Sequence, residues 1–117
     1  MIQVNHYVGL PYEQANCWEL VRRVYRETYD IQLPKLDTVG AVIEQGGWLQ
    51  VAKGAEIDGD VLVFKAGAAK THVGIVVDPK EKLMLHAEEG VDACVARYNS
   101  SIWKSRLRSI YRHRHRL

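Results

Sequence analysis

The clearest structural signal in the chain is residues 16–29, which read NCWELVRRVYRETY. Apolar or small side chains recur there at the spacing of one helix face, at Cys17, Leu20, Val21, Val24, Tyr25 and Thr28. Asn16 is a favourable helix N-cap, and Glu19 stands three residues later, where a capping-box acid belongs. The pattern therefore predicts a helix whose first residue is Cys17 and which the segment ending in Pro34 terminates.

Beyond this helix the spacing of apolar side chains changes. A second, shorter helix is predicted over residues 38–45, capped by Asp37. Strands are then predicted over 61–64, 71–77, 82–87, 91–98 and 107–113, with turns at 58–60 and 78–81 and a turn or short helix at 100–104. Helices followed by a meander of strands indicate an α+β fold, with the N-terminal helices packed on an antiparallel sheet.

Length and composition narrow the class of protein. The chain has 117 residues and a mass of 13.3 kDa, which indicates a single domain over residues 1–117. Its 47% hydrophobic and 26% charged residues exclude a disordered chain and a fibre. No window approaches the ~20 apolar residues of a membrane span, so we expect no membrane insertion. Residues 1–6 lack the basic and apolar regions of a signal peptide, so none is expected.

Charge and cysteines are unevenly placed along the chain. Residues 104–117 hold six basic and no acidic side chains, so the rest is mildly acidic although the net charge is +2. We expect this tail to be solvated charge beside the last strand, and we expect no nucleic-acid partner. The two cysteines, Cys17 and Cys94, are too few for a disulfide scaffold and are expected as free thiols, with Cys94 in the core of a strand.

Cys17 is the first candidate for chemistry. A cysteine in the first turn of a helix faces free backbone N–H groups and the positive end of the helix dipole. Both favour the thiolate and can lower the thiol pKa below its usual ~8.5. The competing interpretation is that Cys17 is a small buried side chain on the core face of the helix, and taken alone the helix start does not exclude it.

Two histidines fall on neighbouring predicted strands. If the turn at 78–81 is tight, residues whose numbers sum to 158 or 159 lie opposite each other, which places His72 directly across from His86 on one face. Such a pair fits a base and the residue that orients it, in a chain that begins with a nucleophile. Two polar positions on a solvent face are the plainer alternative. A metal bound by the two histidines and a distant cysteine is less expected without a nearby carboxylate.

At these residues the sequence resembles the NlpC/P60 family. The resemblance rests on an ordered set of short segments, namely Gly9-Leu10-Pro11-Tyr12, Asn16-Cys17-Trp18-Glu19-Leu20-Val21-Arg22, Gly59-Asp60-Val61-Leu62-Val63-Phe64, His72-Val73-Gly74-Ile75 and Leu85-His86-Ala87. Trp103 and Tyr111-Arg112 match a closing segment found in the bacteriophage tail-associated branch of the family, which the chain resembles most. The segments cover nearly the whole chain.

The resemblance implies a papain-like cysteine peptidase core that cleaves bacterial cell-wall peptides, commonly between D-glutamate and a diamino acid. It implies Cys17 as nucleophile, His72 as general base and His86 as the orienting residue. Tyr12 matches a tyrosine near the nucleophile that binds substrate or stabilises the oxyanion. No metal or organic cofactor is implied. The branch also implies a place in the virion tail, with other tail proteins as partners and peptidoglycan as substrate.

Some positions depart from the family pattern or carry a second interpretation. Asn16 stands where an aspartate is usual, and Glu19 where many relatives have a small residue. Glu19 raises the alternative of a tail-tip structural subunit with little activity, and an amidase or acyltransferase on the same scaffold is a third possibility. Trp18 and Trp48 are candidates for the lining of a peptide-binding cleft, although packing is the commoner use of tryptophan.

Overall fold

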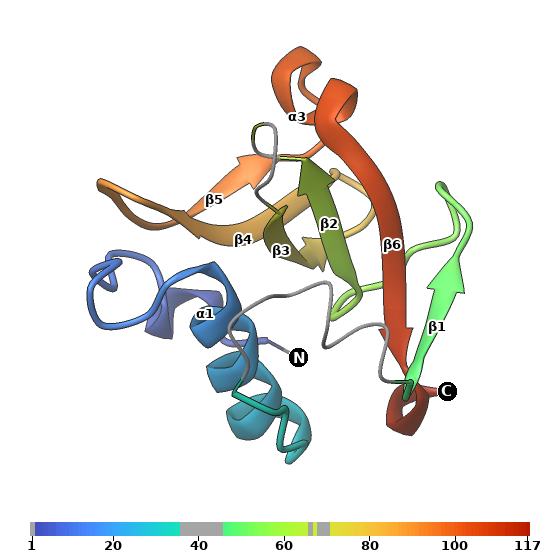
Figure 1. The fold of residues 1–117 in the computed structure, drawn as a ribbon, viewed down its shortest axis with the longest axis horizontal. Coiled ribbons are helices and arrows are strands. Elements are labelled where there is room, and N and C mark those ends of the chain that lie inside the picture. Colours follow the sequence, from blue (N-terminus) through green and yellow to red (C-terminus); the bar gives the residue numbers. More distant parts are fainter. Residues whose placement is uncertain (1, 36–45, 66, 68–70) are drawn as a thin grey trace.

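The helical part of the chain precedes a curved sheet (Figure 1). The computed structural model describes residues 2–35, 46–65, 67 and 71–117, so the helix predicted over 38–45 lies outside the described residues. The elements are, in chain order, η1 (Val4–His6), α1 (Cys17–Val24), η2 (Tyr25–Tyr29), β1 (Trp48–Val51), β2 (Val61–Lys65), β3 (Thr71–Asp78), β4 (Leu83–Glu88), β5 (Val91–Arg97), α3 (Ser101–Arg106), β6 (Leu107–His113) and η3 (Arg114–Arg116). None of the described helices has the length and apolar character needed to cross a membrane.

Six strands form one sheet in the order β1-β6-β2-β3-β4-β5, and every neighbouring pair is antiparallel. The helix-on-sheet arrangement confirms the α+β class. The strand β1 was not predicted, because its middle residues Leu49 and Gln50 are both exposed and show no alternation of burial. Among the described strands it pairs with β6 alone, at the edge of the sheet.

Helix α1 begins where the sequence predicts. The Asn16 side chain accepts a hydrogen bond from the Glu19 backbone N–H at 3.0 Å, so Cys17 is the first helical residue. The helix continues through a π-helical turn, η2, and ends at Asp30, whose φ of 55° is left-handed. Its buried face packs with β3 and β4 through Leu20, Val21 and Val24. This packing fixes the start of α1 relative to the β3–β4 hairpin.

The register of the β3–β4 hairpin differs from the predicted one. His86 lies opposite Gly74 and not opposite His72. The connection holds four residues, 79–82, and a bulge lies between Val76 and Asp78, so the pairing shifts by two residues. A shift of two leaves both histidines on the same face, because side chains alternate with a period of two.

The sheet carries a core on each face. The face covered by α1 holds Val61, Val73, Ile75 and Leu85, and the other holds Leu62, Phe64, Val76, Met84, Tyr98 and Ile110. Trp103 of α3 packs against this second core, with its ring centroid 5.0 Å from that of Phe64. His72 and His86 alternate with the residues of the first core and therefore lie on the face that α3 covers.

The basic C-terminal segment is partly internal, which corrects the expectation of solvated charge. The Asp60 carboxylate is fully buried and accepts hydrogen bonds from the Arg112 guanidinium at 2.9 and 2.8 Å and from Arg116 at 3.2 Å. Arg116 also lies over the Tyr29 ring, 4.5 Å from its centroid. Two of the basic side chains of the tail therefore neutralise a buried acid and hold β6 and η3 against the body of the protein.

Candidate active site

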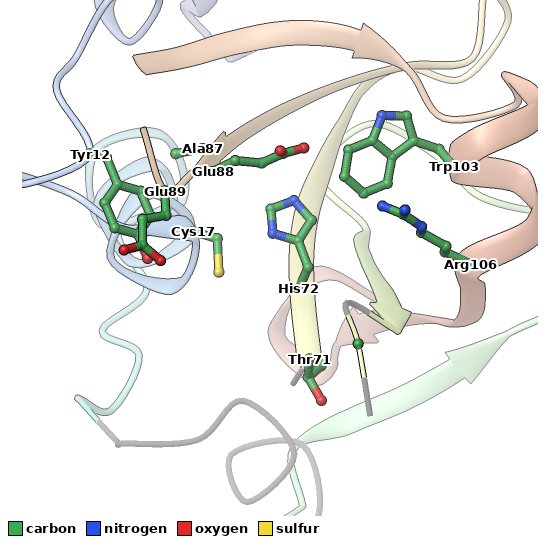
Figure 2. Close-up of a pocket in the computed structure, with 10 residues that line it drawn as sticks. Tyr12, Cys17, Thr71, His72, Ala87, Glu88, Glu89, Trp103 and Arg106 are labelled. Carbon is green, nitrogen blue, oxygen red and sulfur yellow. The ribbon is translucent and has the colours of Figure 1, made fainter. Parts of the chain in front are cut away.

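A cavity of about 470 Å³ lies at the end of the β3–β4 hairpin that is remote from its turn. It is lined from the N-terminal segment and α1 by Tyr12 and Cys17, from β3 by His72, from the end of β4 by Glu88, and from α3 by Trp103 and Arg106. Figure 2 shows Tyr12 and Cys17 on one side of His72, and Trp103 and Arg106 on the other. The structure thus brings the predicted nucleophile, the predicted base and Tyr12 to one cavity.

Cys17 is held at the cavity by the start of α1. Burial raises the pKa of its thiol, whereas the backbone N–H groups of Val73, Trp18 and Cys17 itself act to lower it. The helix start therefore supplies the donors expected from the sequence, but burial outweighs them and the net direction is opposite to the predicted one. Cys17 is a free cysteine, and at rest it is a thiol that needs a base.

The two histidines are directly hydrogen-bonded, although they are not cross-strand partners. His72 Nε2 lies 2.9 Å from His86 Nδ1, and both side chains are buried. Burial lowers the pKa of His72 most, and the charges of His86 and Arg106 lower it further. Burial also lowers the pKa of His86, and Glu88 partly opposes this. Both imidazoles are consequently neutral at neutral pH.

The hydrogen bond between the rings restricts their tautomers. A neutral imidazole carries one N–H, so one ring donates and the other accepts. When His72 donates from Nε2, its Nδ1 keeps a free lone pair, and this nitrogen faces the side of the cavity where Cys17 lies (Figure 2). That tautomer is the one able to take a proton from the Cys17 thiol.

Trp103 holds both rings in place. Its indole is stacked on His72, with centroids 5.2 Å apart and planes at 27°, and it meets the His86 ring edge-on at 5.0 Å. In the sequence, Trp103 stands out only as part of the closing segment of the resemblance. Its contact with the histidines depends on the path of the chain from β5, at one edge of the sheet, to β6, and no local pattern predicts that path.

Cys94 contacts the far side of His86. The two residues are cross-strand partners on β5 and β4, and the Cys94 sulfur lies 3.7 Å from His86 Nε2. The sequence predicted a core thiol without motif context, whereas the structure gives Cys94 a specific partner. Both nitrogens of His86 therefore have neighbours, His72 on one side and Cys94 on the other.

Of the three aromatic residues predicted to line a substrate cleft, one lines the cavity and two do not. Tyr12 lines the cavity, where burial and the proximity of Cys17 raise the pKa of its hydroxyl. Trp18 is buried in the core beneath α1 and donates its indole N–H to the Pro34 carbonyl at 3.0 Å, so it is not among the residues that line the cavity. Trp48 packs against Tyr25 and His113 and is likewise away from the cavity lining.

Glu19 does not close a full capping box. Its two carboxylate oxygens both accept from the Arg22 guanidinium at 2.8 Å, and the expected bond to the Asn16 N–H is replaced by this pair. Glu19 is also absent from the residues that line the cavity. Its charge is thus directed along the helix and neutralised there.

One cluster could hold a metal ion within the described part of the chain. The side-chain ligand atoms of His72, His86 and Glu88 lie within 4.8 Å of one another, so the structure supplies the carboxylate that the sequence did not place. However, the facing nitrogens of the histidines already share a hydrogen bond. A metal would have to break that bond and separate the rings to reach tetrahedral geometry.

The chain is 26% identical over 91 residues to murein DD-endopeptidase MepS/murein LD-carboxypeptidase of Escherichia coli strain K12, and equally to its counterparts in strains O6:H1 and O157:H7. The aligned region is 78% of this chain and 45% of each relative, so the chain spans less than half the length of the curated relatives it matches.

Two solved structures share the fold. An NlpC/P60 family protein from Bacillus cereus ATCC 10987 superposes with a TM-score of 0.74 at 19% identity, over 94% of this chain and 37% of that one. A protein from Staphylococcus aureus Mu50, described as similar to a lipoprotein of the NLP/P60 family, gives 0.73 at 20% identity, over 94% and 38%. Residues 5–112 match the NlpC/P60 family itself. A match of that extent, on a fold that family members share, shows that the chain belongs to the NlpC/P60 family.

Proposed function

We propose that this protein is a cysteine endopeptidase that hydrolyses peptidoglycan stem peptides at the bond between D-glutamate and a diamino acid. The observation that carries the proposal is the shared cavity. Cys17 enters it from a helix start, and His72 enters it with one nitrogen bonded to His86 and the other facing the cysteine side. This is the nucleophile, base and orienting residue of acyl-transfer chemistry.

The reaction follows from the protonation states. His72 Nδ1 takes the Cys17 proton as the sulfur attacks the scissile carbonyl carbon, and the oxyanion is met by the Cys17 backbone N–H and the Tyr12 hydroxyl. The C–N bond then breaks, and His72 returns the proton to the leaving amine. Water, deprotonated by His72, cleaves the thioester to a carboxylate and restores the thiol. His86 orients His72 and accepts its Nε2–H throughout.

The relatives support the substrate class and raise a second candidate bond. The curated Escherichia coli proteins are named murein DD-endopeptidases and LD-carboxypeptidases. Cleavage of a cross-link between D-centred residues, or removal of a terminal residue, is therefore the alternative within the same class of substrate. The family and the catalytic arrangement are common to both candidates.

We also place the protein in a bacteriophage tail, with other tail proteins as partners. The support is sequence resemblance, namely the Gly9–Tyr12 segment, the Cys17-Trp18 pair and the closing Trp103 and Tyr111-Arg112. Glu19 suggested the alternative of a tail-tip subunit without activity. Because the Glu19 carboxylate is paired with Arg22, it no longer favours that alternative. On this proposal the chain co-sediments with purified tail particles, and a chain that stays at the top of the gradient contradicts it.

Digestion of purified peptidoglycan tests the activity. The wild-type protein should release fragments whose mass spectra show a free γ-carboxyl on D-glutamate and a free amine on the diamino acid. Cys17→Ala should release none while keeping its circular dichroism spectrum, and His6→Ala, an exposed histidine outside the cavity, should match the wild type. Turnover by Cys17→Ala above background would remove the nucleophile assignment. An amidase would instead release the whole stem peptide.

A further inference from the structure

Among the described residues that line the cavity, Arg106 is the only arginine. It is the last residue of α3, and its guanidinium lies over the Trp103 ring, 5.8 Å from the centroid. Because the same indole is stacked on His72, α3 places a cation beside the base through one intervening ring. Figure 2 shows the guanidinium directed into the space in front of His72.

No acid of the described chain neutralises this cation. Arg22, Arg112 and Arg116 each bond a carboxylate of the protein, whereas Arg106 makes no hydrogen bond or ion pair with any residue in 2–35, 46–65, 67 or 71–117. Its planar fork of N–H donors is therefore without a partner among the described residues. Such a fork matches a carboxylate, which it can bind through two parallel hydrogen bonds.

Two acidic side chains also line the cavity. Glu88 ends β4 with its side chain 42% exposed, and Glu89 follows in the turn to β5, beside Tyr12 (Figure 2). A negatively charged group in the cavity is repelled by these two carboxylates and attracted to Arg106. Arg106 is the only permanent cation among the described residues that line the cavity, so it is the group there that favours an anion.

We propose that Arg106 binds a carboxylate of the substrate close to the scissile bond and makes the enzyme selective for peptides that carry it over the corresponding amides. This inference rests on the proposed function. In a γ-linked D-glutamyl peptide the carboxylate is the free α-carboxyl of that residue. In a peptide cut near its end it is the C-terminal carboxyl. Both present the same chemistry to Arg106, and the test separates them.

Binding of the carboxylate also prepares the base for its second step. The positive charge of Arg106 disfavours the imidazolium of His72 in the empty site. A carboxylate on Arg106 offsets that charge, so the protonated His72 that must donate to the leaving amine becomes easier to form. Loss of the contact should therefore reduce kcat as well as weaken binding.

Three matched peptides form the test: a γ-D-glutamyl tetrapeptide, its α-carboxamide and its C-terminal amide. The wild type should favour the free acid over one of the two amides by about 10- to 100-fold in kcat/KM, the usual range for a hydrogen bond to a charged group. Arg106→Gln should lose this preference. It should cleave the free acid and the well-cleaved amide more slowly than the wild type does, and the poorly cleaved amide at an unchanged rate. Arg106→Lys should retain part of it. Arg108→Gln removes an exposed arginine outside the cavity lining and should behave as the wild type.

The amide that is discriminated against identifies the carboxylate that Arg106 binds. Equal rates on all three peptides, or a uniform loss in Arg106→Gln, would overturn the inference while leaving the peptidase activity established. If the wild type cleaves no peptide, the proposed function fails. Calorimetry with the Cys17→Ala protein then decides the inference separately. The inference is supported if Cys17→Ala binds the acid more tightly than one of the amides and if this difference disappears in Cys17→Ala/Arg106→Gln. Equal or absent binding of all three peptides overturns it.

Discussion

Cys17 and His72 come from different elements, and each owes its protonation state to its immediate neighbours. The thiol keeps its proton because burial outweighs the backbone N–H groups around the sulfur. His72 stays neutral because it is buried and lies near a second imidazole and a guanidinium. The resting pair is therefore a neutral thiol and a neutral imidazole, and proton transfer accompanies attack on the substrate.

The two histidines should contribute unequally. His72→Ala removes the group that moves the proton and should lower kcat by about 10²–10⁴-fold. His86→Ala removes only the hydrogen-bond partner of His72 Nε2. It should lower kcat less, because Trp103 still holds the His72 ring. His6→Ala is the control. Steady-state kinetics on one peptide gives the comparison, and equal, negligible effects of both substitutions would show that the pair is not catalytic.

The acid side of the pH–rate profile should lie below the ordinary histidine pKa of 6.5. Burial lowers the pKa of His72 most, and the charges of its partner His86 and of Arg106 lower it further. Since its pKa is lowered, the neutral base survives as the pH falls through 6.5 and is lost only further down.

Arg106→Gln should move the acid limb of kcat/KM upward in pH, because a positive charge near His72 is removed. Arg108→Gln should leave it in place. A wild-type limb at or above pH 6.5 would show that the pKa of His72 is not lowered in the free enzyme.

At the scale of single residues, the sequence predicted what depends on close neighbours along the chain. The Asn16 cap and the position of Cys17 follow from a local pattern and are confirmed. The direction of Trp18 and the partner of Cys94 depend on where Pro34 and β4 lie in space. A single-residue pattern contains no information on those positions.

At the scale of elements, α1 combines a start that presents the nucleophile with a charged face that stays out of the cavity. The Glu19–Arg22 pair is partly exposed to solvent, so its contribution to stability is small. Arg22 also donates to the Leu33 carbonyl at 3.0 Å, which ties the segment after the helix back to it. The first turn is therefore stabilised mainly by the Asn16 cap and by the buried face.

Glu19→Gly should lower the free energy of unfolding by about 1–1.5 kcal/mol, from the helix propensity of glycine together with the lost ion pair. Glu19→Ala isolates the ion pair and should cost at most about 0.5 kcal/mol. Neither should raise the hydrolysis rate by as much as about tenfold, because Glu19 does not line the cavity. Urea unfolding and peptide kinetics measure both effects. A large gain in activity would restore the structural-subunit alternative.

The hairpin shows which part of a sheet can be predicted from a pattern. Alternation placed His72 and His86 on one face, and the structure confirms this because a two-residue shift preserves the face. The register itself depends on the four-residue connection and on the bulge between Val76 and Asp78. Neither has a sequence signature as strong as that of a two-residue turn.

At the scale of the molecule, the cavity forms where two helices and one hairpin come together. Helix α1 packs on one face of the sheet, α3 covers the other, and the β3–β4 hairpin ends between them. Arg106 and Trp103 reach the site only through this assembly. The sequence predicted the class of fold and three residues that line the cavity, Tyr12, Cys17 and His72, and it could not predict the wall formed by α3.

The C-terminal segment should be important for stability. Asp60→Asn leaves Arg112 and Arg116 without their buried carboxylate and should lower the free energy of unfolding by about 2–4 kcal/mol, somewhat less than for fully enclosed pairs because the arginines reach water. Asp92→Asn, an exposed acid on β5, is the control. A change of less than about 0.5 kcal/mol in urea unfolding, the range of ordinary surface substitutions, would contradict a structural role for the pair.

Because Trp103 is stacked on His72, its fluorescence should depend on whether the histidine is protonated. An excited indole gives up an electron readily to an adjacent imidazolium and then emits less, whereas a neutral imidazole quenches it weakly. With Trp18 and Trp48 replaced by phenylalanine, the emission of Trp103 becomes an optical titration of the histidine pair. The protonation of the histidine pair can then be followed from the intrinsic fluorescence of the protein, without any added dye.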